Sequence, residues 1–157
     1  DIQRSRGLGD VYKRQGCDEA AYELKEQIKA HLADQGMELV DFGTFDSKAV
    51  LYPDIAITLA ESVSAGEQER GILLCGTGIG MAISANKVPG IRAAQAHDTY
   101  SAERARKSND AQIVTIGARV VGPELAKMIV DSFLRSDFSG GNSKAKVERI
   151  TAYENRD

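Results

Sequence analysis

A cysteine followed by a glycine-rich stretch is the feature of this sequence best suited to chemistry. The run Gly71-Ile-Leu-Leu-Cys75 is continuously apolar, as expected of a buried strand, and Gly76-Thr-Gly-Ile-Gly80 follows it directly. Glycines let the backbone approach a ligand, and successive N–H groups at a helix start form an anion site that also favours a thiolate. A thiolate base beside an oxyanion site suits removal of a proton from the carbon next to a carbonyl.

Two other interpretations of this stretch are open. A cysteine in a buried strand is often only structural. Against this, ligands of open parallel sheets bind at the carboxyl ends of strands, where Cys75 falls. Gly76, Gly78 and Gly80 also partly match a dinucleotide-binding pattern, with Asp98 20 residues after Gly78. Their spacing is G-x-G-x-G rather than G-x-G-x-x-G, so the pattern is weak evidence.

The elements that must position this loop follow from the hydrophobic pattern. The expected strands are 38–42, 71–75, 91–96 and 113–116, and the expected helices are 20–35, 54–65, a helix from the glycine loop through Asn86, 100–107, 123–134 and 144–153. Pro53 suits the first turn of the second helix, and Gly36 suits the end of the first. Regular alternation of strands and helices predicts an α/β fold, a parallel sheet with helices on both faces.

The first 15 residues show neither helical nor strand periodicity and resemble a translated sequencing adapter. We expect residues 1–15 to be a non-native addition and residues 16–157 to form one domain. The alternative is a basic arm for an acidic partner, since the segment has four basic and two acidic side chains, a net charge of +2. A strand should precede the first helix, so we expect residues 11–15 to stand in place of the first of five strands. Lys13 and Arg14 would then destabilise the sheet.

The composition excludes several function classes. With 157 residues, 42% hydrophobic and 27% charged, the chain is suited to one globular core. Its net charge of −3 argues against a nucleic-acid binder. No apolar run approaches the roughly 20 residues that span a bilayer, and no signal peptide is visible, so we expect no membrane partner and a cytoplasmic location. Cys17 and Cys75 are expected to be reduced thiols.

The stretch GILLCGTGIGMAISANKVPG, residues 71–90, closely resembles the RpiB/LacAB family of sugar-phosphate isomerases. The resemblance runs from Gly16 to about the C-terminus and includes Gly16-Cys-Asp18, Asp41-Phe-Gly-Thr44, Tyr52-Pro53 and Ala118-Arg-Val-Val-Gly122. It implies a Rossmann-like three-layer αβα sandwich and a homodimer with sites between subunits, with a tetramer left open. It also implies interconversion of phosphorylated aldoses and ketoses through an enediolate, without metal or cofactor.

The resemblance implies a role for each matching residue. Cys75 would move the proton between C1 and C2, while Asp18 would handle the hydroxyl protons at O1 and O2. The amides of the loop and the Thr77 hydroxyl would hold the enediolate oxygens. The residues expected to bind substrate are Gly76, Gly78, Gly80, Tyr52 and Asn109 for the sugar, and Arg119 and Lys146 for the phosphate. Without the resemblance, Asp18 is a helix cap and Arg119 a solvated side chain.

Several positions depart from the usual ribose-5-phosphate isomerase pattern. The residue after Asp18 is Glu19 rather than histidine, and the C-terminal phosphate arginines align with Asn142 and Lys146. Lysine binds phosphate as a point charge without the bidentate fork of arginine. These departures keep open an alternative function, a non-catalytic phosphate- or nucleotide-binding module of the same fold.

The departure at Ser108 bears on the substrate. Ribose-5-phosphate isomerases of this type usually have a histidine there, just before Asn109, which opens the furanose ring. A four-carbon sugar phosphorylated on O4 cannot form a furanose, so it needs no such group. The sequence around 96–113 also resembles the erythrulose-4-phosphate isomerase branch, and both that sugar and ribose 5-phosphate stay open. His97, at the end of a strand, is the candidate catalytic histidine; the alternative is a hydrogen-bonded residue beside Asp98.

Two further residues are expected to have no role in the site. His31 falls in the middle of a helix among polar neighbours, which predicts a solvated side chain. Cys17 lies next to Asp18 and is expected to be a small buried residue.

Overall fold

The computed structural model describes residues 6–10, 19–43 and 51–157. A five-stranded sheet lies at its centre, with the strand order β2-β1-β3-β5-β4 and every neighbouring pair parallel. The strands are β1 (Arg6–Asp10), β2 (Leu39–Asp41), β3 (Arg70–Cys75), β4 (Ala93–Gln95) and β5 (Ile113–Gly117). The helices are α1 (Glu19–Asp34), α2 (Tyr52–Ser64), α3 (Ile79–Ala85), α4 (Thr99–Lys107), α5 (Pro123–Arg135) and α6 (Lys144–Glu154), with a 3₁₀ turn, η1 (Gly141–Ser143), before α6.

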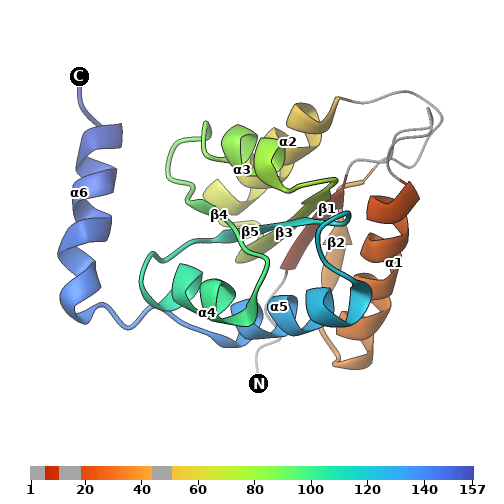
Figure 1. The fold of residues 1–157 in the computed structure, drawn as a ribbon. Coiled ribbons are helices and arrows are strands. Elements are labelled where there is room, and N and C mark those ends of the chain that lie inside the picture. The colour runs from red at the N-terminus through yellow and green to blue at the C-terminus, as the bar shows by residue number, and fades with distance from the viewer. Residues whose placement is uncertain (1–5, 11–18, 44–50) are drawn as a thin grey trace.

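Helices cover both faces of the sheet, which confirms the predicted αβα sandwich (Figure 1). Successive side chains of a strand point to opposite faces, and β3 follows this rule. Leu73 packs with the buried side chains of α2 and α3. Ile72 and Leu74 pack on the other face with those of α1, α4 and α5. Both faces of β3 are therefore buried, as its continuous apolar run predicts.

The first strand differs from the expectation. β1 lies between β2 and β3, where Gly7 pairs with Gly71 and Gly9 with Leu73. It precedes residues 11–15, which were expected in place of this strand and lie outside the described residues. Residues 6–10 form a strand although their sequence has no strand periodicity, because the backbone groups of β3 need hydrogen-bond partners and any extended segment can supply them. That residues 1–15 are a non-native addition stays a prediction.

The helices begin and end at or near the residues that the sequence indicates. Gly36 has a φ of 75°, a conformation that favours glycine, and its N–H donates to Ala33 O as α1 ends. Pro53 lies in the first turn of α2, where its missing N–H costs nothing. The ends of the elements differ from the expected ones by at most two residues, and β4 is three residues shorter than the predicted 91–96. None of the helices in the described ranges is long and apolar enough to cross a membrane.

The last helix stands apart from the rest of the molecule, beyond the edge strand β4 (Figure 1). Val147 is the one residue of α6 that is buried, and the Glu154 carboxylate accepts the Gly90 N–H at 3.0 Å. Ile150 and Tyr153 are 52% and 57% exposed. This chain therefore leaves apolar side chains of α6 uncovered.

Candidate active site

The loop after β3 lies where a parallel sheet most readily binds ligands. β2 lies on one side of β1, and β3 lies on its other side. In open parallel sheets, ligands bind at the carboxyl ends of the strands where the strand order reverses, which in this sheet is between β1 and β3. Cys75 is the last residue of β3. The structure thus places Cys75 at the edge that the sequence predicted.

The Cys75 side chain is half-buried, and its sulfur has a defined donor. The Gly78 N–H donates to Sγ at 3.1 Å, which stabilises negative charge on the sulfur. Gly78 has a φ of 78°, and a Cβ there would lie 3.1 Å from backbone atoms of Ile116. A side chain is therefore disfavoured by the backbone conformation and by the tight contact. The glycine lets the loop turn back so that its N–H reaches the sulfur.

Thr77 is exposed at the tip of the loop. Its Oγ1 accepts the Ile79 N–H at 3.2 Å, which leaves its own hydroxyl proton to donate elsewhere. The loop packs tightly on β5, because a Cβ on Gly117 would lie 2.7 Å from Thr77 Cα. Backbone contact of this kind holds the loop in one place relative to the sheet.

Tyr52, the first residue of α2, lies against the same loop. A Cβ on Gly80 would come within 2.5 Å of the Tyr52 ring and hydroxyl. Gly80 therefore provides the space that the ring occupies. The structure brings Tyr52 together with the glycine loop, as the resemblance implied.

Arg119 belongs to the same edge of the same chain. Its backbone N–H donates to Gly76 O at 3.1 Å, and the residue is exposed. The backbone of Arg119 thus lies beside the glycine loop. An arginine guanidinium can pair with a phosphate through two parallel hydrogen bonds.

His97 also lies near this edge, where it is engaged with the backbone. Its Nε2 accepts the Gly117 N–H at 2.9 Å, so while this bond lasts the ring proton is on Nδ1. The neighbouring Asp98 caps α4 by accepting the Ser101 N–H at 2.6 Å. This bond and that of the Ser101 hydroxyl lower the pKa of Asp98. The contacts are those of a hydrogen-bonded histidine, and a catalytic role for His97 stays a prediction.

Ser108 and Asn109 lie at the opposite, amino edge of the sheet. Asn109 O accepts from Arg92 Nε at 3.1 Å, and Arg92 directly precedes β4. Ser108 ends α4, and its Oγ accepts from Arg104 Nε at 2.8 Å. The length of β5 alone, roughly 13 Å, separates this edge from the edge of Cys75. Within one chain the structure does not bring Asn109 to the glycine loop.

Lys146 is likewise distant from the loop. It is exposed on α6, which lies outside β4, whereas Cys75 ends β3 and is separated from β4 by β5. Asn142, in η1, is exposed beside it in sequence. Of the predicted site, Asp18 lies outside the described residues, as does Cys17. Cys75, Thr77, Tyr52, Arg119 and His97 thus lie at or near the carboxyl edge of the sheet. Asn109, at the amino edge, and Lys146, on α6, lie away from it.

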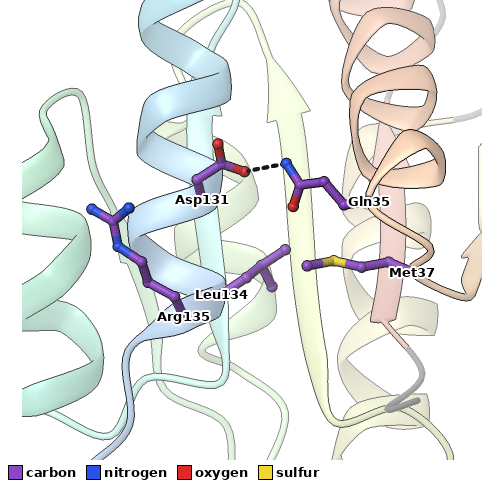
Figure 2. Close-up of a pocket in the computed structure, with 5 residues that line it drawn as sticks. All are labelled: Gln35, Met37, Asp131, Leu134 and Arg135. Atoms are coloured by element: carbon purple, nitrogen blue, oxygen red, sulfur yellow. Dashed lines mark hydrogen bonds between the residues drawn. The ribbon is translucent and has the colours of Figure 1, made fainter. Parts of the chain in front are cut away.

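His31 is not on a solvated helix face, and that expectation was wrong. Its Nε2 lies 2.9 Å from Asp131 Oδ1 across the contact between α1 and α5, and the side chain is only 25% exposed. Gln35 donates to the same carboxylate at 3.1 Å. Figure 2 shows this Gln35–Asp131 pair beside a hollow of about 260 Å³, which is lined by Gln35, Met37, Asp131, Leu134 and Arg135. Sequence reasoning missed the contact of His31 with Asp131 because the two residues are 100 positions apart.

Some residues that hold the loop were not predicted from the sequence. Gln95 Nε2 donates to Thr77 O at 2.7 Å, and Thr115 Oγ1 donates to Gly78 O at 2.7 Å. A short strand with a polar residue gives no signal for such contacts, because they depend on strand order. Within residues 19–43 and 51–157, no group of three or more His, Cys, Asp or Glu residues is arranged to hold a metal ion.

Known proteins resemble the chain along most of its length. Residues 15–150 match the family described as Ribose/Galactose Isomerase, LacAB/RpiB. A Listeria innocua protein named "Ribose-5-P isomerase B" is 59% identical over 85% of this chain and 90% of its own length. A Pectobacterium atrosepticum protein named "D-erythrulose-4-phosphate isomerase" is 54% identical over 90% of this chain and 94% of its own.

Solved structures agree with the sequence relatives. Ribose-5-phosphate isomerase B from Clostridium thermocellum has a TM-score of 0.86 and 44% identity, and the match covers 96% of this chain and 97% of that one. The fold, the glycine loop and the sequence similarity all indicate the same family. This chain therefore belongs to the LacAB/RpiB family of sugar isomerases.

Proposed function

We propose that this protein is an aldose–ketose isomerase for a small phosphorylated sugar and that Cys75 moves the proton. The observation that carries the proposal is the bond from the Gly78 N–H to Cys75 Sγ, at the carboxyl edge of the sheet, in a chain of this family. The relatives named as ribose-5-phosphate and erythrulose-4-phosphate isomerases support the same reaction class.

The reaction needs one base at carbon and one proton carrier at oxygen. The Cys75 thiolate takes the proton from the carbon next to the carbonyl, and the C–H electron pair forms the enediolate double bond. The loop amides and the Thr77 hydroxyl stabilise the negative oxygen. Asp18 moves a proton between O1 and O2, and the Cys75 thiol returns its proton to the neighbouring carbon. Substrate and product are isomers, so no electrons leave the sugar.

Substrate binding is assigned to side chains at the same edge. Arg119 binds the phosphate, because its backbone N–H is bonded to Gly76 O of the loop and its guanidinium matches phosphate geometry. Tyr52 lies over Gly80 and presents its hydroxyl to a sugar oxygen. We place the activity in the cytoplasm, because a charged sugar phosphate crosses a bilayer poorly.

We further propose that two copies of the chain complete each site. Asn109 and Lys146 lie away from the Cys75 edge of their own chain, so they serve the Cys75 of a second copy. The uncovered apolar side chains support this pairing. They are Ile79 and Ile83 on α3 and Ile150 and Tyr153 on α6, each at least half exposed. A homodimer is the minimal assembly, and a tetramer of such dimers would contain the same sites.

Ser108 favours a four-carbon substrate. Arg104 Nε donates to its oxygen, so this position holds a hydroxyl already engaged by a cation rather than an imidazole that exchanges protons. Ring opening of a furanose needs proton transfer, whereas erythrulose 4-phosphate is already open. The two relatives described above carry different substrate names at similar identity, so overall similarity does not separate the two sugars.

The deciding experiment is a coupled isomerase assay on D-erythrulose 4-phosphate and D-ribose 5-phosphate in parallel. We expect turnover of at least one sugar and a higher kcat/KM for the tetrulose. Higher kcat/KM on ribose 5-phosphate would overturn the argument from Ser108. Turnover of neither sugar, together with tight binding of AMP or NAD in calorimetry, would overturn the isomerase assignment.

Shared sites can be tested separately by complementation. Cys75→Ala and Lys146→Ala proteins are each expected to have little activity. Co-expression in equal amounts should restore about a quarter of wild-type activity, because half of the dimers are mixed and each has one intact site. No gain over the separate variants would show that Lys146 serves its own chain or no site.

A further inference from the structure

Four consecutive carbonyl groups, from Cys75 at the end of β3 to Gly78 in the glycine loop, accept hydrogen bonds from the neighbouring part of the sheet; Gly78 O also accepts the Ala82 N–H of α3 at 3.1 Å. Cys75 O accepts the Ala118 N–H at 2.8 Å, and Gly76 O accepts the Arg119 N–H at 3.1 Å. Thr77 O accepts from Gln95 Nε2 at 2.7 Å, and Gly78 O accepts from Thr115 Oγ1 at 2.7 Å. The four donors other than Ala82 lie in β4, β5 or the turn after β5. The four carbonyls are therefore bound to the same part of the sheet.

Holding a carbonyl fixes the next amide. A peptide unit is planar and trans, so its N–H points away from its C=O. The unit between Thr77 and Gly78 has its carbonyl bound by Gln95 and its N–H bound to Cys75 Sγ at 3.1 Å. The bonds at its two ends are therefore coupled. Rotation of this unit would break both of them.

Among the residues that hold these carbonyls, Gln95 is the one whose side chain can be substituted without disturbing the core or the backbone. Thr115 is fully buried, so its substitution would also disturb the core. The bonds from Ala118 and Arg119 are made by the backbone, so no side-chain substitution removes them. Gln95 is exposed on the edge strand, and its side-chain amide donates to Thr77 O. A side chain at such a position is free to be apolar or charged, as far as folding is concerned.

We propose that Gln95 is a positioning residue for Cys75 and acts through the Thr77–Gly78 peptide unit. Its amide holds the carbonyl, so the Gly78 N–H stays aimed at the sulfur. A hydrogen bond to the carbonyl also polarises the peptide and strengthens its N–H as a donor. The inference rests on the proposed function of Cys75 as the base. It adds a residue from β4 that acts on the sulfur through the backbone of the loop.

Gln95→Met tests the proposal, because methionine keeps the length and apolar stem but cannot donate. We expect kcat to fall roughly ten-fold, the effect of one misaligned hydrogen bond of ordinary strength, while KM stays within about two-fold. The alkylation rate of Cys75 by iodoacetamide at pH 7 should fall about three- to ten-fold, followed by mass spectrometry of its peptide. The alkylation reading needs no turnover, so it separates failure of this inference from failure of the isomerase assignment.

Gln95→Glu adds a signature that a purely structural role lacks. An ionised carboxylate cannot donate to Thr77 O, whereas a protonated one can. The ratio of variant to wild-type kcat should therefore rise as pH falls from 7 to 5.

The control is Gln35→Met, which also removes the amide of an exposed glutamine, here its bond to Asp131 drawn in Figure 2 and its 3.0 Å contact with His31. It should leave kcat and alkylation unchanged. Wild-type kcat and alkylation rates in Gln95→Met, or an equal fall in Gln35→Met, would overturn the proposal.

Discussion

Replacing Gly117 by alanine should disable the loop while leaving the sheet intact. Gly117 ends β5 and pairs with Cys75, and its N–H is held by His97. A Cβ at this position would lie 2.7 Å from Thr77 Cα and 2.8 Å from the Thr77 carbonyl carbon and oxygen. All three are backbone atoms, so no side-chain rotation relieves the clash.

The size of the effect follows from these distances. Ordinary contact begins at 3.4 Å, so the two backbones must part by about 0.7 Å. β5 is fixed between β3 and β4, and therefore the loop has to move. Misplacing a reacting group by about 1 Å costs about 10²-fold in rate, so we expect kcat to fall roughly 30- to 100-fold. Overpacking by a methyl group costs about 2 kcal/mol, which lowers Tm by about 4–8 °C at this chain length.

The assay is steady-state turnover of the preferred sugar phosphate, with Tm measured on the same samples. Gly122→Ala is the control, because a Cβ there has no atom within 4 Å and its φ is −75°. That variant should keep wild-type kcat and lose at most about 3 °C in Tm. A Gly117→Ala protein with kcat within about two-fold of wild type would show that the observed loop position does not matter for catalysis.

Three further outcomes are expected. In Gly80→Ala the new Cβ would displace the Tyr52 ring, so KM should rise several-fold, and Tyr52→Ala in the same chain should add little further loss; additive losses would contradict this. Asp41→Asn should lower Tm at pH 7 by about 4–8 °C, because the Lys25 side chain, which is 3% exposed, loses its 3.2 Å ion pair with Asp41, while Glu26 is farther away at 3.8 Å. Burial raises the pKa of Asp41, but hydrogen bonds from Lys29 and the Gly43 N–H and the charge of Lys25 outweigh burial, so the pKa in the folded protein is below 3.8. The contribution of Asp41 to the stability of the fold is therefore fully present above pH 3.8 and is lost as pH falls through the folded pKa. The Tm gap should therefore close in acid, and a constant gap would refute the ionic explanation. Replacing residues 6–10 by an apolar strand without glycine should raise Tm by about 4–8 °C, since two glycines in a strand cost about 2 kcal/mol; an unchanged Tm would contradict this.

Local patterns in the sequence were enough to predict most of the fold and the centre of the site. An apolar run that ends in cysteine and glycines predicts a buried strand and a loop, and Cys75 lies where that pattern placed it. β1 was misplaced because its pairing with β3 depends on the backbone, which leaves no periodicity to read. The pairing of His31 with Asp131 joins helices far apart in sequence, so local polarity misrepresented its surroundings.

The separation of Asn109 from Cys75 shows what residue matching alone omits. A helix that follows a parallel strand runs back to the amino edge of the sheet, so the end of α4 has to lie far from the end of β3. Topology could therefore have shown that Asn109 does not approach Cys75 within one chain. The bond from Gln95 to Thr77 O had no such signal, because it depends on how β4 is placed relative to the loop.

The most direct test of the account is turnover by the Cys75→Ala protein, measured beside wild type on whichever of the two sugar phosphates wild type prefers. We expect kcat to fall by at least about 10³-fold, because no other group is assigned to take the proton from carbon, while substrate binding in calorimetry stays within about ten-fold of wild type. Retention of more than about a tenth of the wild-type kcat would contradict the assignment of Cys75 as the base.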